Sequence, residues 1–416
     1  MAGVRELMRD RRFALLWLGQ AVNTVGHGLT IVALATLLVQ THGAGTLGLV
    51  LAADSAAMGL TLLAGGVIAD RYSRTAVMAV SDVVRSVAVL GYALAPASSP
   101  TLLLVCFAIL EGFGVALFQP AWRAVLPQVV PTDRLREVNA VVQLTNRGGL
   151  LLGAALGGVL VATVGPRPAL LLDAATYALS LTTLLVIRLP AVVEQAPEGL
   201  RAALHEAREG ISVVVRRPWV SAVMLQGTVQ VLFAFAPMKV LLPVVAQERY
   251  GDGAYGILMA CLPAGMILGS LVAMRLHPRR EGLVAMHAVA PTAAVMVCLA
   301  VDVPLVVFAV VQVVAWAGIS IFAVLWFSSL QRAYPSAIQG RVFSVEQLAT
   351  FALDPIGLAL APAAAAAVGV PTVGIVAAVV LLVTTYAVLL VPGVTHFRDP
   401  DREPVVEVPI APDGRA

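Results

Sequence analysis

Long apolar runs separated by short polar turns fill almost the whole chain. An α-helix needs about 20 apolar residues to cross the hydrocarbon core of a bilayer. About twelve runs of that length follow one another, at roughly 13–39, 46–69, 76–95, 101–122, 138–163, 168–188, 218–245, 253–274, 282–300, 304–328, 343–368 and 371–392. This pattern predicts an all-α polytopic membrane protein, embedded in a lipid bilayer.

The composition supports this class and argues against several others. Hydrophobic residues make up 59% of the 416 residues and charged residues only 12%, whereas charged residues are about a quarter of a typical soluble protein. The net charge of +3 gives no reason to expect a nucleic acid partner. The three cysteines lie singly in apolar runs and the six histidines show no ligand spacing. We therefore expect no disulfide framework, no metal and no cofactor.

The basic residues are distributed unequally between alternate turns. If the amino terminus is cytosolic, the inside segments hold 22 of the 27 Lys and Arg residues, and the outside loops hold only Arg167 and Arg249. Cytosolic loops of membrane proteins carry such an excess. We expect a multi-pass protein of the bacterial inner (cytoplasmic) membrane with both termini in the cytosol.

The longest connection divides the apolar runs six and six. The expected organisation is an N-terminal six-helix bundle (1–189), a cytosolic linker with an amphipathic helix (190–217), a C-terminal six-helix bundle (218–395) and a disordered cytosolic tail (396–416). When the two halves of the sequence are aligned with an offset of 204 residues, they match weakly. In this alignment Gly153 corresponds to Gly357 and Gly165 to Gly369. Such a repeat predicts two similar bundles related by an axis along the membrane normal.

The turn between the second and third runs, residues 65–75, reads GGVIADRYSRT. Gly66 allows close approach of a neighbouring helix, and Asp70 places a carboxylate at the water interface. Arg71 and Arg74 supply the positive charge of a cytosolic turn. An ordinary basic loop is the alternative interpretation. The turn resembles the signature between the second and third helices of the major facilitator superfamily of transporters.

Other segments resemble the drug-exporter branch of that superfamily, which includes macrolide efflux pumps and siderophore (enterobactin-type) exporters. The resemblance is carried by FQPAWRAVLPQVVPTDRLREVNAVVQL, GLLLGAALGGVLVATVG, RPWV and QGRVFSV. It implies twelve transmembrane helices in two six-helix bundles. It also implies a cytosolic gate that joins Gly66, Asp70, Arg71 and Arg74 to the start of the eleventh helix near Arg341.

Two departures from the superfamily pattern concern proton coupling. In the fourth run, AILEG lacks the arginine that many proton antiporters carry and has Glu111 instead. In the fifth run, Gly153-Ala154 replaces a glycine-proline pair. Proton coupling therefore follows less directly from the resemblance than the fold does.

Ionisable residues inside a bilayer cost ~3 kcal/mol or more and are functional hypotheses by default. Glu111 lies on the fourth helix, which the resemblance implies lines the central cavity, and it is our first candidate to load and release a proton. A structural acid bonded to a neighbouring helix is the alternative. Asp54 and Asp354 are the other proton-coupling candidates, although Asp354 precedes Pro355 and can instead satisfy backbone amides at a kink.

Other charged residues within the runs include Asp82, Arg85, Asp173 and Lys239. Asp82 and Arg85 are three residues apart on the third helix and can pair, so we interpret them as structural or as part of the gate. Asp173, on the sixth helix, is interpreted as structural. Lys239 lies toward the outer end of the seventh helix, where we expect its side chain to reach the membrane interface. Binding of an anion in the cavity is the alternative for Lys239.

Polar residues on the cavity helices are candidates for orienting a substrate at a small desolvation cost. Alternatively, such residues join membrane helices to one another. Arg147 shares a face of the fifth helix with two of them and can also pair with Glu111. The substrate-cavity candidates are Asn23, Gln143, Asn146, Arg147, Gln226, Gln230, Gln312 and Trp316.

These features together predict a secondary active transporter rather than an enzyme. We expect a monomer that exports a small amphiphilic molecule, such as a drug or secondary metabolite, by alternating access and proton antiport. Uptake of a metabolite or lipid flipping is the alternative within transport. A membrane-embedded enzyme would need a cluster of nucleophile, base or metal ligands, which the scattered acids and histidines do not supply. A non-transporting sensor is a further alternative.

Overall fold

The computed structural model describes residues 10–130, 134–187 and 211–399, with the side chains of 62–71, 135, 136, 336, 337 and 351 outside that description. In these ranges every regular element is helical and no strand occurs. The first half contains α2 (Arg11–Arg71), α3 (Arg74–Leu94), α4 (Thr101–Val129), α5 (Leu135–Val164) and α6 (Pro166–Val186). The second half contains α8 (Pro218–Gln230), η2 (Val231–Phe235), α9 (Ala236–Tyr250), α10 (Ala254–Ala273), α11 (Glu281–Val289), α12 (Thr292–Ala300), α13 (Leu305–Ala333), α14 (Ser336–Phe351), α15 (Asp354–Val368), α16 (Val370–Ala387), η3 (Val388–Leu390) and η4 (Val394–His396).

The twelve predicted runs correspond to these elements. Eleven helical segments in the described chain are long and apolar enough to cross a membrane, and the first of them covers the run 13–39 and most of the run 46–69. Those two runs are the two parts of α2, which meet at Gly43, where φ is +78° and the chain reverses. The seventh span consists of α8, η2 and α9, and the eleventh consists of α14 and α15. The prediction of an all-α polytopic fold is confirmed.

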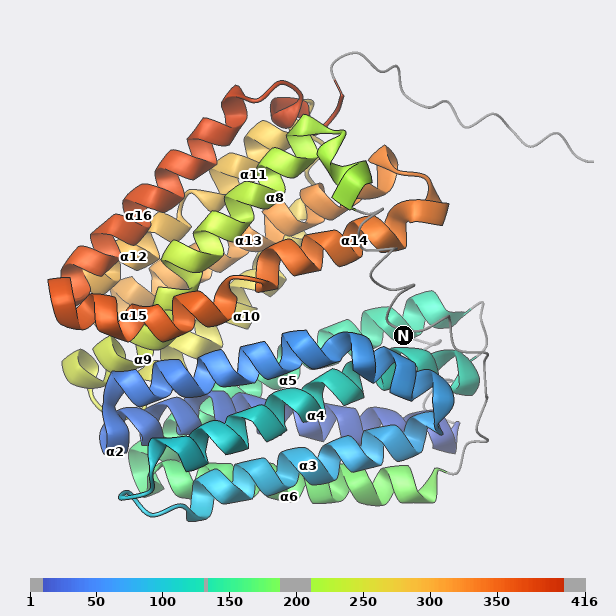
Figure 1. Cartoon of the computed structure of the whole chain (residues 1–416), viewed down its shortest axis with the longest axis vertical. Helices are drawn as coiled ribbons and strands as arrows, with labels where there is room; N and C mark the ends of the chain where they lie inside the picture. Colours follow the sequence, from blue (N-terminus) through green and yellow to red (C-terminus); the bar gives the residue numbers. More distant parts are fainter. Residues whose placement is uncertain (1–9, 131–133, 188–210, 400–416) are drawn as a thin grey trace, which may run out of the picture.

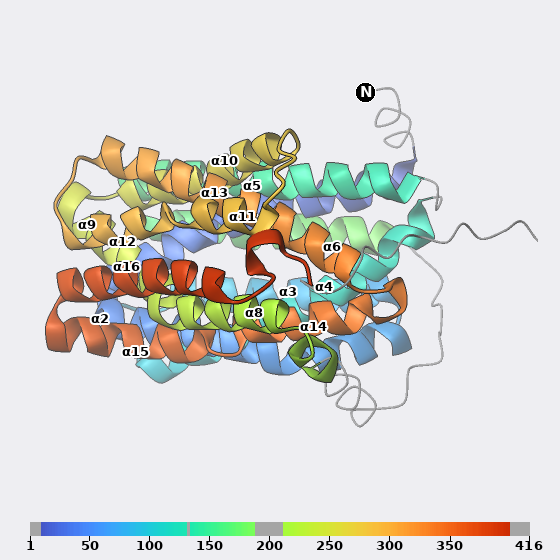
Figure 2. The same cartoon turned by 90° about the horizontal axis from the view of Figure 1, so that it is seen from above.

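The helices form two bundles that lie against each other (Figures 1 and 2). We call α2 to α6 the N bundle and α8 to α16 the C bundle. The N bundle contacts the C bundle through α2, which meets α9 and α15, and through α5, which meets α10. The ribbons of the two bundles diverge toward the end of the molecule where the chain begins (Figure 1).

The bundles are held together near the end that carries the turn at Gly43, which we call the Gly43 end. Gln40 Nε2 donates a hydrogen bond to Asp252 Oδ1 across the two bundles at 3.0 Å. A Cβ atom on Gly158 of α5 would lie 3.0 Å from the Cα atom of Gly256 of α10. These backbones approach so closely only because neither residue has a side chain.

The weak sequence repeat has a structural counterpart. Gly165 joins α5 to α6 with φ +87°, and Gly369 joins α15 to α16 with φ +84°. Both residues adopt a backbone conformation that favours glycine. A Cβ on Gly153 would lie 2.1 Å from a backbone oxygen of the first span, and one on Gly357 would lie 2.6 Å from a side chain of the seventh. The same inter-helix contact is therefore built twice, once in each bundle.

The ends of the predicted segments differ in detail from the structure. Residues 211–215 are helical, whereas most of the predicted linker helix lies outside the described residues. The chain stays packed past His396, where we expect the tail to begin, because Asp399 accepts a hydrogen bond from Trp219 Nε1 at 2.8 Å and pairs with Arg217 at 3.3 Å. The described C bundle therefore extends at least to Asp399.

Candidate functional site

Glu111 lies in the interior of the N bundle. Glu111 is 7% exposed, and its carboxyl group lies near enough to Asp54, Arg85 and Asp173 to interact with them electrostatically. The next residue, Gly112, explains why α4 can approach the second span: a Cβ there would lie only 2.3 Å from the backbone oxygen of Asp54. Glu111 and Asp54 therefore come from two different spans but belong to one cluster.

Two more carboxyl groups belong to this cluster. Asp82 of α3 accepts hydrogen bonds from Ser180 Oγ at 2.6 Å and from Asn23 Nδ2 at 3.3 Å. Asp173 of α6 accepts hydrogen bonds from Thr30 Oγ1 at 2.6 Å and from a second threonine hydroxyl at 3.0 Å. Both carboxyl groups are buried. We interpreted Asp82 and Asp173 as separate structural or gate residues from the sequence, but the structure brings them together.

Arg85 is the cation of the cluster. Its guanidinium carbon lies 4.6 Å from the ring centroid of Tyr177 and 6.0 Å from that of Phe118. It interacts electrostatically with Glu111, Asp82 and Asp173. A guanidinium between aromatic faces is stabilised by the ring quadrupoles as well as by the acids. Arg85 on the third helix thus supplies a cation near the segment of the fourth helix that lacks the arginine of many proton antiporters.

The pairing of Arg147 with Glu111 that the sequence allows does not form in this structure. Arg147 Nη1 instead donates hydrogen bonds to the backbone oxygen of Met266 and to Ser270 Oγ, both at 3.2 Å. These partners lie on α10 of the C bundle. Arg147 therefore joins the two bundles.

Lys239 and Asp354 form an ion pair, with Nζ and Oδ1 2.8 Å apart. The side chain of Lys239 is 46% exposed and that of Asp354 is 4% exposed. We expected the Lys239 side chain to reach the membrane interface. The structure gives it an ion-pair partner from another span, which we did not predict. Asp354 is the first residue of α15, and its Oδ2 also accepts a hydrogen bond from Ser55 Oγ at 3.0 Å.

Two of the substrate-cavity candidates join helices within the C bundle. Gln230 Nε2 donates to Thr384 Oγ1 at 3.0 Å and to Thr385 Oγ1 at 2.9 Å. Gln226 Nε2 reaches Thr385 Oγ1 at 3.5 Å. Both glutamines thus attach α8 to α16, the last span. This arrangement matches the alternative role that we gave these glutamines, which is to join membrane helices to one another.

The other candidates divide between the interior and the surface of the bundles. Asn23 belongs to the carboxyl cluster, and Asn146 Oδ1 accepts hydrogen bonds from the first span. Gln143 is exposed. Gln312 is fully buried and accepts a hydrogen bond from Trp316 Nε1 at 3.1 Å. The Trp316 ring lies 6.5 Å from that of Phe235, so α13 and the seventh span meet there through aromatic side chains.

The predicted cytosolic gate is only partly described. The side chains of Gly66, Asp70 and Arg71 lie outside the described residues. Arg74 Nη1 donates a hydrogen bond to the backbone oxygen of Ala124 at 2.6 Å, within the N bundle. Arg341 lies on α14. The gate remains a prediction.

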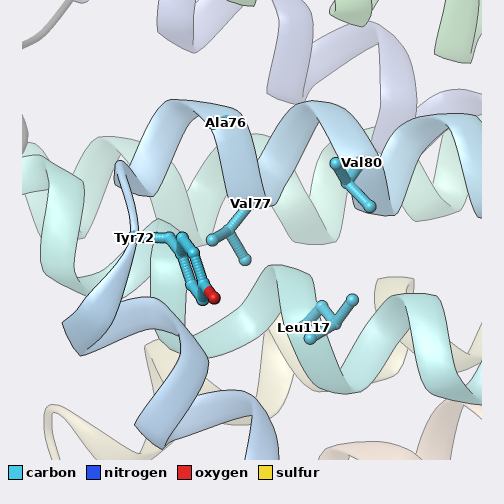
Figure 3. Close-up of a pocket in the computed structure, with 5 residues that line it drawn as sticks. All are labelled: Tyr72, Ala76, Val77, Val80 and Leu117. Atoms are coloured by element: carbon cyan, nitrogen blue, oxygen red, sulfur yellow. The ribbon is translucent and has the colours of Figure 1, made fainter.

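A small pocket lies on the wall of the N bundle, at the start of α3. Tyr72, Ala76, Val77, Val80 and Leu117 line it, with the ring of Tyr72 between α3 and α4 (Figure 3). Tyr72 and Val80 are exposed. Its lining is apolar and includes none of the predicted site residues, so this pocket does not represent the site.

Comparison with known proteins decides the family. The family model of the Major Facilitator Superfamily matches residues 16–353. The chain belongs to the Major Facilitator Superfamily. Membership of this superfamily identifies a multi-pass secondary transporter of small molecules and not an enzyme, in agreement with the sequence prediction.

The relatives and solved structures agree with this assignment. The enterobactin exporter EntS of Escherichia coli O1:K1 / APEC is 28% identical over 354 residues, which cover 84% of each chain. A mutant of the nucleoside transporter NupG has a TM-score of 0.74 at 12% identity, covering 90% of this chain and 98% of its own. An inward-facing bacterial homologue of the iron transporter ferroportin has a TM-score of 0.72 at 14% identity, covering 92% and 98%. The structural likenesses show the superfamily fold, and the relative supports the resemblance to siderophore exporters.

Proposed function

We propose that this superfamily member exports an amphiphilic small molecule across a bacterial cytoplasmic membrane, with both termini in the cytosol, in exchange for protons. Similarity to enterobactin exporters supports the direction and makes a drug or secondary metabolite the expected substrate class. The two repeated bundles support rocking about a site near the membrane midplane. If the termini are cytosolic, the Gly43 end is external, and the contacts there make this conformation inward-facing.

The observation that carries proton coupling is the excess of buried acids in the N bundle. Three buried acids, Asp82, Glu111 and Asp173, and the partly buried Asp54 interact electrostatically with one cation, Arg85. One guanidinium balances one carboxylate. Because an uncompensated carboxylate in a dry interior is less stable than the neutral acid, this cluster favours bound protons.

Hydrogen bonding separates the four acids. The Asp82 carboxylate accepts two hydrogen bonds, and that of Asp173 accepts one from Thr30 and shares the hydroxyl hydrogen of Thr176 with the Asp173 backbone oxygen. Such bonds stabilise a charged carboxylate. The described residues supply no comparable pair of donors to Glu111 or Asp54. We assign proton exchange to Glu111 first and to Asp54 second.

Substrate-dependent proton flux is the test. The protein is reconstituted in proteoliposomes under an imposed pH gradient, and internal pH and substrate movement are followed for enterobactin, a macrolide and a panel of lipophilic antibiotics. Glu111→Gln is compared with the parent and with Asp302→Asn, a change at an exposed loop residue. We expect a transported compound to dissipate the gradient in the parent and in Asp302→Asn but not in Glu111→Gln.

Each result has a distinct meaning. Substrate movement without proton flux would remove the proton coupling and the role of Glu111 but leave a transporter. Movement only into the compartment that corresponds to the cytosol would favour uptake over export. Movement of fluorescent phospholipids between leaflets, with no effect of soluble compounds, would favour lipid flipping.

A further inference from the structure

Two stripes of polar side chains face each other inside the N bundle, one on the first span and one on the sixth. The first stripe consists of Asn23, His27 and Thr30 of α2, and the second of Asp173, Tyr177 and Ser180 of α6. Within each stripe the residues recur every three or four positions, so they share one face of their helix. We call these two sets the polar stripes.

A carboxyl group lies at each end of the polar stripes. At one end, Thr30 Oγ1 donates a hydrogen bond to the Asp173 carboxylate at 2.6 Å. At the other end, the Asp82 carboxylate of α3 accepts hydrogen bonds from Ser180 Oγ at 2.6 Å and from Asn23 Nδ2 at 3.3 Å. Asp173 and Ser180 are two helical turns apart. The two carboxylates therefore lie at levels about 10 Å apart along α6, roughly the length of three or four hydrogen bonds of about 2.8 Å.

Four buried polar atoms along the stripes have no hydrogen-bond partner among the described residues. They are Asn23 Oδ1, His27 Nδ1, Arg85 Nε and Tyr177 Oη. Asn23 is 4% exposed, Arg85 7% and Tyr177 1%. The guanidinium carbon of Arg85 lies 4.6 Å from the ring centroid of Tyr177, so these atoms share one region. Buried polar atoms of native proteins are almost always hydrogen-bonded, either to protein or to internal water.

Water suits this set of atoms better than an ion does. Arg85 Nε can only donate a hydrogen bond and Asn23 Oδ1 can only accept one, whereas the Tyr177 hydroxyl can do both. A cation would satisfy the amide oxygen but would be repelled by the guanidinium, and an anion would be repelled by the carboxylates. A water molecule donates and accepts, and it needs two to four such polar partners.

The polar stripes lie apart from the interface between the bundles. The N bundle contacts the C bundle through α2 and α5, whereas α3 and α6 lie on the side of the N bundle that is far from the C bundle (Figure 1). The face of α2 that carries the first stripe is turned toward α3 and α6, because its hydrogen bonds go to those helices. The water site is therefore distinct from a substrate site between the bundles.

The equivalent region of the C bundle is apolar. At the offset that relates the two halves of the sequence, Asp82, Asp173 and Tyr177 correspond to Met286, Ala377 and Leu381. The three apolar residues are buried. The seventh and last spans are joined there by uncharged amide and hydroxyl groups. Packing of such a bundle therefore does not require the charges, and ionisable residues inside a membrane indicate a function.

We propose that internal water molecules connect Asp82 to Asp173 and form a proton relay within the N bundle, separate from the path of the substrate. The waters donate to Asn23 Oδ1 and accept from Arg85 Nε. The Tyr177 hydroxyl lies between the levels of the two carboxylates and acts as a positioning residue for the chain of waters. This inference rests on the proton coupling proposed above.

The relay conserves protons at each step. Asp173 in its acid form gives its proton to the nearest water, each water passes on one of its own protons, and the Asp82 carboxylate accepts the last one. Asp173 is then a carboxylate, Asp82 is an acid and every water molecule is regenerated. Because hydrogen bonds stabilise both carboxylates in the charged form, each holds a proton only in transit, whereas Glu111 stores it.

The order of the residues gives the relay a direction. Asp173 lies toward the Gly43 end of the sixth span, and Ser180, which bonds to Asp82, lies toward the opposite end. If the termini are cytosolic, Asp173 is on the outer side of the relay and Asp82 on the cytosolic side. Protons that drive export then move inward from Asp173 to Asp82.

The first experiment tests for water at the site and needs no substrate. Hydroxyl radicals are generated by X-ray radiolysis of the full chain in lipid nanodiscs, and oxidation of individual tyrosines is followed by mass spectrometry. Bound water next to a buried side chain produces radicals that oxidise it. Tyr92 is the matched reference, because it is also fully buried but its hydroxyl donates to the backbone oxygen of Leu104 at 3.0 Å. We expect Tyr177 to be oxidised several-fold faster than Tyr92.

The second experiment separates proton movement from substrate movement. The panel compound that dissipates the pH gradient in the parent serves as a radiolabelled probe in proteoliposomes. Accumulation driven by the gradient is compared with exchange of labelled for unlabelled compound at equal pH. We expect Tyr177→Phe to lower driven accumulation roughly tenfold or more, since a positioned proton donor or acceptor contributes at least that much to a proton transfer. Exchange should be unchanged.

Two further variants control this result. Tyr92→Phe removes a bonded hydroxyl, so it should lower the melting temperature and leave both modes of transport as in the parent. Tyr177→Phe should keep the melting temperature of the parent, because its hydroxyl bonds to none of the described residues. Asp173→Asn interrupts the relay at its outer end and should reproduce the transport defect of Tyr177→Phe.

Several results would overturn the relay. These are equal oxidation of Tyr177 and Tyr92, equal driven accumulation in Tyr177→Phe and Tyr92→Phe, or loss of exchange together with driven accumulation in a folded Tyr177→Phe protein. Slower oxidation of Tyr177 in sodium chloride than in choline chloride would show a bound cation in place of water. Absence of proton flux in the parent would remove the proposed proton coupling and the relay together. Failure of the relay alone leaves proton flux in the parent that Tyr177→Phe does not change.

Discussion

The guanidinium carbon of Arg85 lies 4.6 Å from the ring centroid of Tyr177, inside the N bundle. The aromatic face covers a cation that also interacts with Glu111, Asp82 and Asp173. One buried cation of α3 therefore interacts electrostatically with acids of α3, α4 and α6.

Replacement of Arg85 should affect both stability and coupling. Arg85→Gln leaves the buried acids without a cation, and we expect a loss of about 3 kcal/mol in the free energy of unfolding. Arg85→Lys keeps the charge but loses the planar contact with Tyr177, so it should be intermediate. Thermal unfolding in detergent measures the effect, and Arg279→Gln, at an exposed turn, is the control. Equal melting temperatures for Arg85→Gln and Arg279→Gln would contradict the role of Arg85.

The sequence predicted the spans and the repeat because both depend on local composition. Apolar length alone identifies membrane helices, and Gly165 and Gly369 occupy equivalent turns with nearly equal φ values. These glycines were matched by their positions in the two halves. Their agreement shows that the repeat reflects backbone geometry and not only apolar composition.

The charged cluster could not be predicted in the same way. In a membrane the lipid-facing and core-facing residues are both apolar, so periodicity gives little information on how a helix is rotated about its axis. The rotations of α3 and α6 decide that Asp82 and Asp173 face the interior beside Arg85. Likewise, Lys239 and Asp354 are 115 positions apart in the chain, and no local pattern indicates their contact. The missing arginine of the fourth helix was the one available signal, but we used it only to judge proton coupling and did not infer a cation from another helix.

A side chain at Gly158 should prevent complete closure of the Gly43 end. A Cβ there would lie 2.9 Å from the backbone oxygen of Gly253, and backbone cannot move aside as easily as a flexible side chain. Gly158→Ala should therefore increase the open population at that end, measured by single-molecule fluorescence between dyes at positions 98 and 302. Gly148→Ala is the control, because its Cβ would meet nothing within 4 Å. No difference between the two variants would show that the glycine contact does not limit closure.

Gln230 and Trp316 of the C bundle should have different roles, the first in stability and the second in substrate preference. Gln230 bonds to the last span, so Gln230→Leu should lower the free energy of unfolding by about 1–2 kcal/mol and leave the order of substrate preference unchanged. Trp316 packs near Phe235 between α13 and the seventh span, so Trp316→Ala should change the relative transport of large and small compounds. Competition assays in proteoliposomes measure the order of preference. A changed order of substrate preference in Gln230→Leu would indicate that Gln230 lines the substrate cavity.

The last described residues should stabilise the end of the C bundle opposite the Gly43 end. Asp399 accepts a hydrogen bond from Trp219 Nε1 and pairs with Arg217, so it joins the chain end to the start of the seventh span. The neighbouring Phe397 is buried, stacks on Trp219 with ring centroids 5.9 Å apart, and has φ +50°, which is uncommon for a residue with a side chain. Such a backbone conformation persists only where surrounding contacts hold it.

Asp399→Ala removes the acceptor for both Trp219 and Arg217. We expect a loss of about 1–2 kcal/mol in the free energy of unfolding, since a partly buried hydrogen-bonded pair is worth more than an exposed ion pair. Arg398→Ala changes the exposed neighbour and is the matched control. Tryptophan fluorescence during thermal unfolding follows five indoles, among them that of Trp219, which loses its partner directly. Unfolding curves that coincide for the two variants would show that the chain end is attached by Phe397 and its aromatic neighbours alone.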